Sequence, residues 1–245
     1  MKASSAIKWK VSDVFNVFIL TFVLELLLVV LIQALGVGEI VNRISDNQLL
    51  KSAILLILYL LQVAGMLFPL WYFVLRRYES GSKEFGFRWI GIGKTILWII
   101  IAYLFYLGLS IFLIEIFYCL GIESFGFEKQ TSIFDIFVTN ISGVLVALFI
   151  AVIMAPIIEE IFFRGFILQT LVKRISAFWG VIITALIFAA VHFEFRSIMP
   201  LIILSFILNI LFVKTRSIWP CILFHIFNNT ITFIGLYLIE MGYWL

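Results

Sequence analysis

Long apolar runs recur along the whole chain, and they limit the folds that it can adopt. Several runs exceed 18 residues, and the 245 residues are 64% hydrophobic with only 13% charged. Soluble domains carry about a quarter charged residues, whereas an apolar run of this length is typical of a helix that crosses a bilayer. A membrane β-barrel would need alternating apolar and polar residues instead. We therefore expect an all-α, polytopic membrane helix bundle.

The apolar runs predict about seven to eight transmembrane helices in a single integral membrane domain over residues 1–245. Pro156 can bend a membrane helix without ending it, so the helical stretch Ile157–Val172 either stands alone or continues the fourth span as one long bent helix. The expected spans are Val14–Leu35, Leu49–Leu75, Ile96–Leu120, Phe134–Ala155, Trp179–Phe193, Ile198–Val213 and Ile218–Leu238.

The distribution of basic residues predicts the orientation. With the N-terminus in the cytoplasm, only Arg43, Lys51, Lys129 and Arg196 of the 17 Lys and Arg residues fall on the outside. Cytoplasmic connections are enriched in these residues, so we expect seven spans in a plasma membrane, expected to be bacterial, with the N-terminus cytoplasmic. The polar connection Arg76–Lys94 is interpreted as a loop on the anionic leaflet. The net charge of +3 gives no indication of nucleic-acid binding.

Charged side chains within the apolar runs are candidates for function, since each costs about 2.5–3.5 kcal/mol at the bilayer centre on insertion scales. Glu25 and Glu115 stand alone, and a hydrogen bond between helices explains each of them sufficiently. The other ionisable groups are Glu159, Glu160, Arg164, His192 and His225, and the amides are Asn140, Asn209, Asn228 and Asn229.

The segment APIIEEIFFRG, residues 155–165, places two glutamates beside an arginine. Glu160 and Arg164 are four residues apart, so they share one helix face and can pair. Glu159 lies about 140° around the helix from Arg164, so it is free to face the bundle interior. A pair of acids anchored near the cytoplasmic face by a basic residue would also explain the pattern.

The only two histidines occur in later apolar runs, each near a possible partner. Phe188 precedes His192 by one helical turn in FAAVH. Asn229 follows His225 by one turn in HIFNN, and Asn228 lies about 60° around the helix from His225. With these span limits, Glu159 and His225 share the cytoplasmic half, but His192 lies too far towards the outside. A returning stretch Ile157–Val172 or a deeper fifth span would remove the conflict.

These residue types are sufficient for hydrolysis without a serine or cysteine nucleophile. A carboxylate in an apolar pocket suits a general base for water, a histidine can hold the same water, and a histidine with an amide can stabilise an oxyanion. Glu159, His192 and His225 with a water would alternatively be a ligand set for Zn²⁺. We favour the metal-free form, because no second carboxylate or carbonyl for each histidine is evident in the sequence.

The three patterns EExxxR, FxxxH and HxxxN, in this order, resemble the CPBP family of intramembrane endopeptidases, which includes CAAX prenyl endopeptidases and bacterial proteins of bacteriocin processing or immunity. The resemblance covers roughly residues 134–238. It implies a helical bundle with a cytosol-facing cavity, Glu159 as the water-activating base with His192, and His225 with Asn229 at the oxyanion. Glu160, Arg164 and Phe188 would be supporting residues.

The leading hypothesis is therefore an intramembrane endopeptidase that acts on a membrane-associated peptide or protein, with the lipid bilayer as its other partner. A non-enzymatic immunity or scaffold protein that binds a partner helix is the alternative. A small transporter or proton relay is third, because we find no internal repeat of the kind common in transporters. The sequence leaves the substrate, the cleavage site and the oligomeric state open.

Overall fold

The computed structural model describes residues 7–44, 47–122, 126–127 and 141–240, and in these ranges it is helical with no strand. This confirms the all-α membrane bundle. The elements are α1 (Val11–Ala34), α2 (Val37–Arg43), α3 (Gln48–Leu70), η1 (Trp71–Arg76), α4 (Ile92–Cys119), α6 (Ile141–Ala147), η2 (Leu148–Met154), α7 (Ala155–Glu160), η3 (Ile161–Leu168), α8 (Gln169–Arg174), α9 (Ala177–Val191), η4 (Phe195–Ser197), α10 (Ile198–Thr215) and α11 (Trp219–Glu240).

Six helices in the described part of the chain are long and apolar enough to cross a membrane. The expected fifth span is instead the 15-residue helix α9, which is about 23 Å long against a hydrocarbon core of about 30 Å. The beginning of the expected fourth span, with Asn140, lies outside the described residues. The six are Val11–Ala34, Gln48–Arg76, Ile92–Cys119, Ile141–Arg174, Phe195–Thr215 and Trp219–Ile239.

Pro156 does not end the fourth span, because Ile141–Arg174 is one continuous helix of 34 residues. Of the two alternatives, the long helix is therefore confirmed. Before the proline the helix widens into π register in η2, where the N–H of Ala155 donates to the carbonyl of Ile150, five residues back. The next bond in that register would reach the carbonyl of Ala151, but Pro156 has no N–H. The Asn229 amide donates to this carbonyl at 3.0 Å instead.

The chain forms two compact units. The first comprises Met1–Ile7, Ser82–Ser132 and Glu159–Asn228, and the second comprises Lys8–Gly81, Ile133–Ile158 and Asn229–Leu245. The expectation of a single domain over residues 1–245, with a motif-bearing core at 134–238, stays a prediction.

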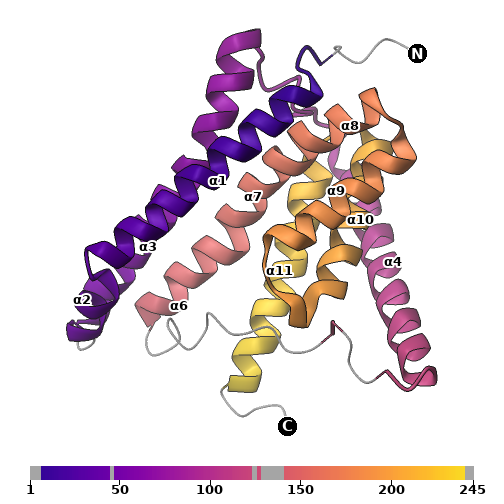
Figure 1. The fold of residues 1–245 in the computed structure, drawn as a ribbon. Helices are drawn as coiled ribbons and strands as arrows, with labels where there is room; N and C mark the ends of the chain where they lie inside the picture. Colours follow the sequence, from indigo (N-terminus) through magenta and orange to yellow (C-terminus); the bar gives the residue numbers. More distant parts are fainter. Residues whose placement is uncertain (1–6, 45–46, 123–125, 128–140, 241–245) are drawn as a thin grey trace. The chain divides into compact units, whose positions relative to one another are not determined.

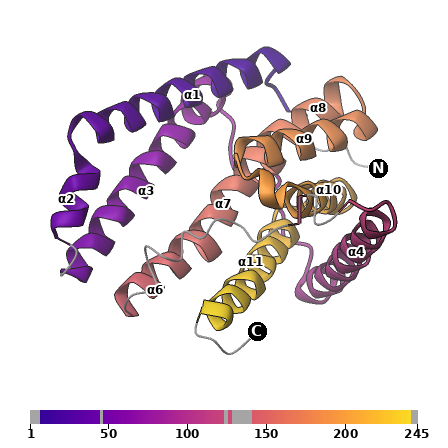
Figure 2. The ribbon, with the colours of Figure 1, turned by 60° about the horizontal axis from the view of Figure 1, so that its bottom comes forward.

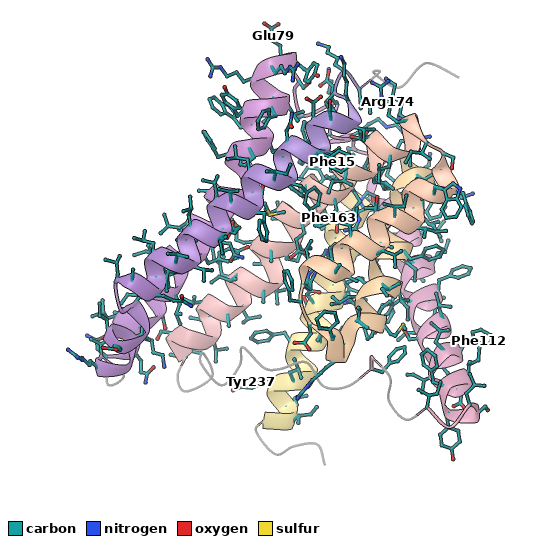
Figure 3. The ribbon with its side chains drawn as sticks, viewed as in Figure 1. Phe15, Glu79, Phe112, Phe163, Arg174 and Tyr237 are labelled. Atoms are coloured by element: carbon teal, nitrogen blue, oxygen red, sulfur yellow. The ribbon has the colours of Figure 1, made fainter. Side chains whose placement is uncertain are left out.

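In the second unit, α1 and α3 lie side by side (Figures 1 and 2), and α3 also packs against α6. Gly65 of α3 permits the close approach of α1, since a Cβ there would lie 2.8 Å from Oε1 of Glu25. Phe15 of α1, labelled in Figure 3, is 64% exposed, as expected for an outer surface that faces lipid.

In the first unit, α10 is the central helix. It packs against α9, α4 and η3, and α8 folds back onto α9 (Figure 2). Half of its most apolar 18-residue stretch is buried, against 6% for α4. The unit therefore packs η3, which carries Arg164, and α9, which carries Phe188, against α10.

The connection before α4 is anchored to this unit by several contacts. The Gly86 carbonyl accepts from the N–H of Ile218 at 2.9 Å, and Arg88 Nη2 donates to the Thr215 carbonyl at 3.2 Å. Phe85 is 3% exposed and packs so closely on Gly165 that a Cβ there would lie 2.9 Å from its ring. Residues 85–88 thus contact η3 and the turn between α10 and α11, and the expected position of the connection on the anionic leaflet stays a prediction.

Helix α10 ends at Arg216, an exposed residue with a left-handed backbone (φ 53°). This conformation costs a residue with a Cβ about 1 kcal/mol relative to glycine. We expect Arg216→Gly to raise the melting temperature by about 2–4 °C, measured in detergent by circular dichroism. Arg216→Ala is the matched control, because it removes the charge but keeps the strain. An equal rise in the Ala variant would show that the charge, and not the backbone, limits stability.

Candidate active site

The two adjacent glutamates end α7, where the helix passes into the π-type segment η3. Such π segments are frequent at functional sites, because they shift the side chains that follow relative to an α-helix. Glu160 and Arg164 are both fully buried, and Arg164 Nη1 donates to Glu160 Oε1 at 2.9 Å. The pair that the four-residue spacing predicts is thus present. Glu159 is 22% exposed in its side chain and takes no part in it.

The Arg164 guanidinium also forms hydrogen bonds on the edge that faces away from Glu160. Nε donates to Asn209 Oδ1 at 3.1 Å, and Nη2 donates to the Ser205 hydroxyl at 2.8 Å and carbonyl at 3.2 Å. The guanidinium carbon Cζ lies 4.9 Å from the centre of the Phe188 ring, a favourable cation–π distance. A buried charge with this many partners is rigidly oriented.

His225 of α11 is bound to the same pair. Its Nδ1 lies 2.8 Å from Glu160 Oε1, the oxygen that also accepts from Arg164. Because a carboxylate oxygen beside a guanidinium is an acceptor, the proton of this bond belongs to Nδ1. In a neutral ring Nε2 then carries a lone pair, and it lies 3.8 Å from Glu159 Oε2.

His192 is oriented by its own helix. Its Nδ1 lies 2.6 Å from the Phe188 carbonyl, which can only accept, so Nδ1 again carries the proton. The Phe188 ring packs between the two histidines, 4.5 Å from the His192 ring and 6.0 Å from the His225 ring. Phe163, labelled in Figure 3, supports Phe188 edge-on at 4.9 Å. The Nε2 atom of His192 lies 3.9 Å from Glu159 Oε2.

Three acceptor atoms therefore converge without a donor among them. Glu159 Oε2 lies 3.9 Å from Nε2 of His192 and 3.8 Å from Nε2 of His225. Each Nε2 carries a lone pair and no proton when its ring is neutral. These separations are too long for direct hydrogen bonds and leave room for a water that donates one hydrogen to Glu159 and the other to one of the histidines. The arrangement requires a proton donor or a cation, which is the electrostatic condition for binding and polarising a water molecule.

The depth conflict between Glu159 and His192 is resolved by a helical hairpin. Glu159 lies 16 residues before Ile175 and His192 lies 16 residues after Ser176, the two residues of the turn between α8 and α9. Antiparallel arms of equal length return His192 to the level of Glu159. The placement of Glu159 at the inner end of a span was wrong, because the helix continues past Pro156 to Arg174, labelled in Figure 3.

Asn229 and Asn228 follow His225 on α11. Asn229, four residues on, belongs to the second unit, where one hydrogen of its amide is donated to the Ala151 carbonyl. The Asn229 amide has a second N–H. Asn228 is 8% exposed. The expected oxyanion role of His225 with Asn229 thus stays a prediction, and the structure adds a role in satisfying the carbonyl that Pro156 leaves free.

The zinc alternative meets one condition, and its ligand spacing is slightly wider than that of a closed zinc site. Each histidine has the second partner that zinc ligands usually need, the Phe188 carbonyl for His192 and Glu160 for His225. The argument against zinc from missing partners was therefore wrong. However, zinc ligands at about 2.0–2.1 Å place neighbouring donors about 3.4 Å apart, and the Glu159–histidine separations are wider. Within the described ranges, no three His, Cys, Asp or Glu side chains are placed to hold a metal ion.

Two polar residues of this network were not assigned a role from the sequence. Asn209 and Ser205 are fully buried in α10 and hold the edge of Arg164 that faces away from Glu160. The signal was available, because an amide in the middle of an apolar run needs a partner. The sequence alone does not indicate which of several polar residues that partner is.

Comparisons with known proteins agree with the motifs. Residues 141–231 match the family described as "Type II CAAX prenyl endopeptidase Rce1-like". Over 155 residues the chain is 30% identical to "Putative membrane peptidase YdiL" of Bacillus subtilis (strain 168), which covers 62% of this chain and 58% of that protein. No solved structure gives a significant match. The resemblance to the CPBP family is thereby confirmed over the region that carries Glu159, His192 and His225.

We expect Arg164→Leu to destabilise the protein by about 3–5 kcal/mol, because Glu160 would remain as a buried charge without its guanidinium. The measurement is thermal unfolding in lipid nanodiscs. Arg164→Leu combined with Glu160→Gln should recover part of this loss, since the double variant has no unpaired charge. Arg43→Leu is the control, because Arg43 and Glu39 form an exposed pair. An Arg164→Leu protein as stable as the Arg43→Leu protein would contradict the buried pair.

Proposed function

We propose that this chain, whose residues 141–231 match the family of type II CAAX prenyl endopeptidases, hydrolyses a peptide bond of a membrane-associated peptide or protein. A membrane peptidase of the CAAX type is the general assignment that the family match supports. The single observation that carries the mechanism is the convergence of Glu159 Oε2 on Nε2 of both histidines, at 3.8 and 3.9 Å.

Glu159 is the base. A water between Glu159 and His192 transfers a proton to Oε2 as its oxygen attacks the carbonyl carbon of the scissile bond, and His192 accepts the second hydrogen bond of that water through Nε2. The amide becomes a tetrahedral oxyanion. Glu159 then returns the proton to the departing nitrogen, which leaves as the amine while the carbonyl reforms as a carboxylic acid. Glu160 is unsuited to this role, because Arg164 and His225 already occupy its Oε1.

His225 stabilises the oxyanion when its Nε2 is protonated. Its Nδ1–H is donated to Glu160, so a proton on Nε2 makes an imidazolium that is paired with a buried carboxylate. This cation directs its second N–H towards the charge that develops on the substrate oxygen. The second amide hydrogen of Asn229 is the further donor that the family resemblance implies.

The decisive variant is Glu159→Gln, which keeps the size of the side chain and removes its basicity. Purified protein in liposomes would be given a quenched fluorescent peptide with a farnesylated CAAX end, and the same peptide with an acyl anchor. We expect Glu159→Gln to lower the cleavage rate by at least about 100-fold, the usual contribution of a general base.

The matched control for this experiment is Glu115→Gln, the same substitution at an exposed glutamate of α4, which should cleave at the wild-type rate. Full activity of a correctly folded Glu159→Gln protein would overturn the mechanism. If the wild-type protein cleaves neither peptide, the choice of substrate fails, and a panel of transmembrane peptides replaces the two probes.

The metal-free form has its own test. We expect purified wild-type protein to contain no stoichiometric zinc by mass spectrometry, and its cleavage rate to survive incubation with a strong chelator. Zinc at one ion per chain that is lost in His192→Ala and His225→Ala proteins would contradict the metal-free form. It would assign Glu159, His192 and His225 as the ligands.

A further inference from the structure

Asn209 is a fully buried amide in the middle of α10, the central helix of the first unit. Its neighbours Leu208 and Leu211 are also buried, so an amide at this position costs stability unless both of its ends are bonded. Both are bonded. Nδ2 donates to the Val181 carbonyl of α9 at 2.9 Å, and Oδ1 accepts from Nε of Arg164 at 3.1 Å.

These two bonds fix the orientation of Arg164. The guanidinium is planar and rigid, so holding Nε on one edge determines the direction of Nη1 on the other. Nη1 points at Glu160 Oε1, 2.9 Å away. Ser205 supports the same edge through Nη2, with its hydroxyl at 2.8 Å and its carbonyl at 3.2 Å.

The chain of contacts continues to a histidine. Glu160 Oε1 accepts from Arg164 and is also 2.8 Å from Nδ1 of His225. Five helical segments are joined in this way, from the Val181 carbonyl of α9 through Asn209 of α10, Arg164 of η3 and Glu160 of α7 to His225 of α11. His192 is not part of the chain, because its Nδ1 is held by the Phe188 carbonyl of its own helix.

We propose that Asn209 is a positioning residue that holds His225 in the Nδ1–H tautomer, with Nε2 directed at Glu159. A free histidine side chain favours the opposite tautomer, with the proton on Nε2, so the Nδ1–H form requires an acceptor in a fixed place. Asn209 keeps that acceptor, Glu160 Oε1, in place through Arg164. The catalytic consequence rests on the proposed function, but the tautomer itself does not.

Nuclear magnetic resonance of ¹⁵N-labelled histidine tests the proposal directly. The chain has only two histidines, so full-length protein in nanodiscs gives two rings, which a His192→Gln variant assigns. The nitrogen shifts distinguish N–H from a lone pair. At a pH where both rings are neutral, we expect Nδ1–H in both.

In Asn209→Leu, which keeps the number and branching of the side-chain heavy atoms and has no polar atoms, His225 should shift in part to the Nε2–H tautomer while His192 stays unchanged. His192 is thus an internal control in the same spectrum. Thr184→Val is the matched control variant, since it also removes a buried polar group, on α9, whose hydroxyl has no hydrogen-bond partner among the described residues. It should leave both rings unchanged.

Asn209→Asp keeps an oxygen acceptor for Nε of Arg164 but loses the donor to the Val181 carbonyl, so we expect it to change the His225 spectrum less than Asn209→Leu does. If neither Asn209 variant folds, Ser205→Ala removes one acceptor from the same edge of Arg164 and should move the His225 signals in the same direction, by less. A His225 spectrum unchanged in Asn209→Leu, or in Ser205→Ala where it alone folds, would overturn the proposal. So would an Asn209→Asp protein that behaves as Asn209→Leu does.

Kinetics with the farnesylated peptide separate this inference from the proposed function. Asn209→Leu should lower kcat by on the order of 100-fold, as expected when a reacting group is misplaced by about 1 Å, and leave KM unchanged, since Asn209 does not contact substrate. Loss of the tautomer in a protein whose Glu159→Gln variant remains active would reject the mechanism and keep the positioning role. A retained tautomer with an inactive Glu159→Gln variant would do the reverse.

Discussion

The buried ion pair of Glu160 and Arg164 is the interaction on which the rest of the site depends. Two charges without exposure to water are stable only if nearly every donor and acceptor around them is satisfied. That requirement recruits Asn209 and Ser205 from α10 and His225 from α11, while Phe188 of α9 covers the guanidinium. Helices α9, α10 and α11, which lie apart in the sequence, thus all contact the Glu160–Arg164 pair.

The same pair gives the two adjacent glutamates, Glu159 and Glu160, different surroundings. Glu160 is committed to Arg164 and His225, whereas Glu159 has no direct hydrogen bond to either histidine and lies partly exposed. Each histidine has its Nδ1 anchored, one by Glu160 and the other by the Phe188 carbonyl, so both Nε2 atoms are left for Glu159. Fixed tautomers on both rings convert an arrangement of three polar side chains into a site with a defined place for one proton.

Pro156 shows how a membrane helix continues through a local defect. A proline removes one backbone hydrogen bond, and η2 absorbs this loss in π register while Asn229 satisfies the free carbonyl. The helix therefore continues to Arg174, and the hairpin with α9 places Glu159 and His192 at equal distances from the turn. The alignment itself depends only on the helical arms after Pro156 and on the turn at Ile175 and Ser176.

The sequence by itself determined the all-α membrane fold, the Glu160–Arg164 pair, and the residues Glu159, His192 and His225 as candidates, because apolar length and helical spacing are local properties. The depth of His192, the partners of its ring and of His225, and the roles of Asn209, Ser205 and the segment 85–88 were decided only by the tertiary structure. The reason is physical: a helix period fixes which residues share a face, but not which distant helix that face meets. That choice follows from packing around α10 and from satisfying every buried polar atom of Arg164.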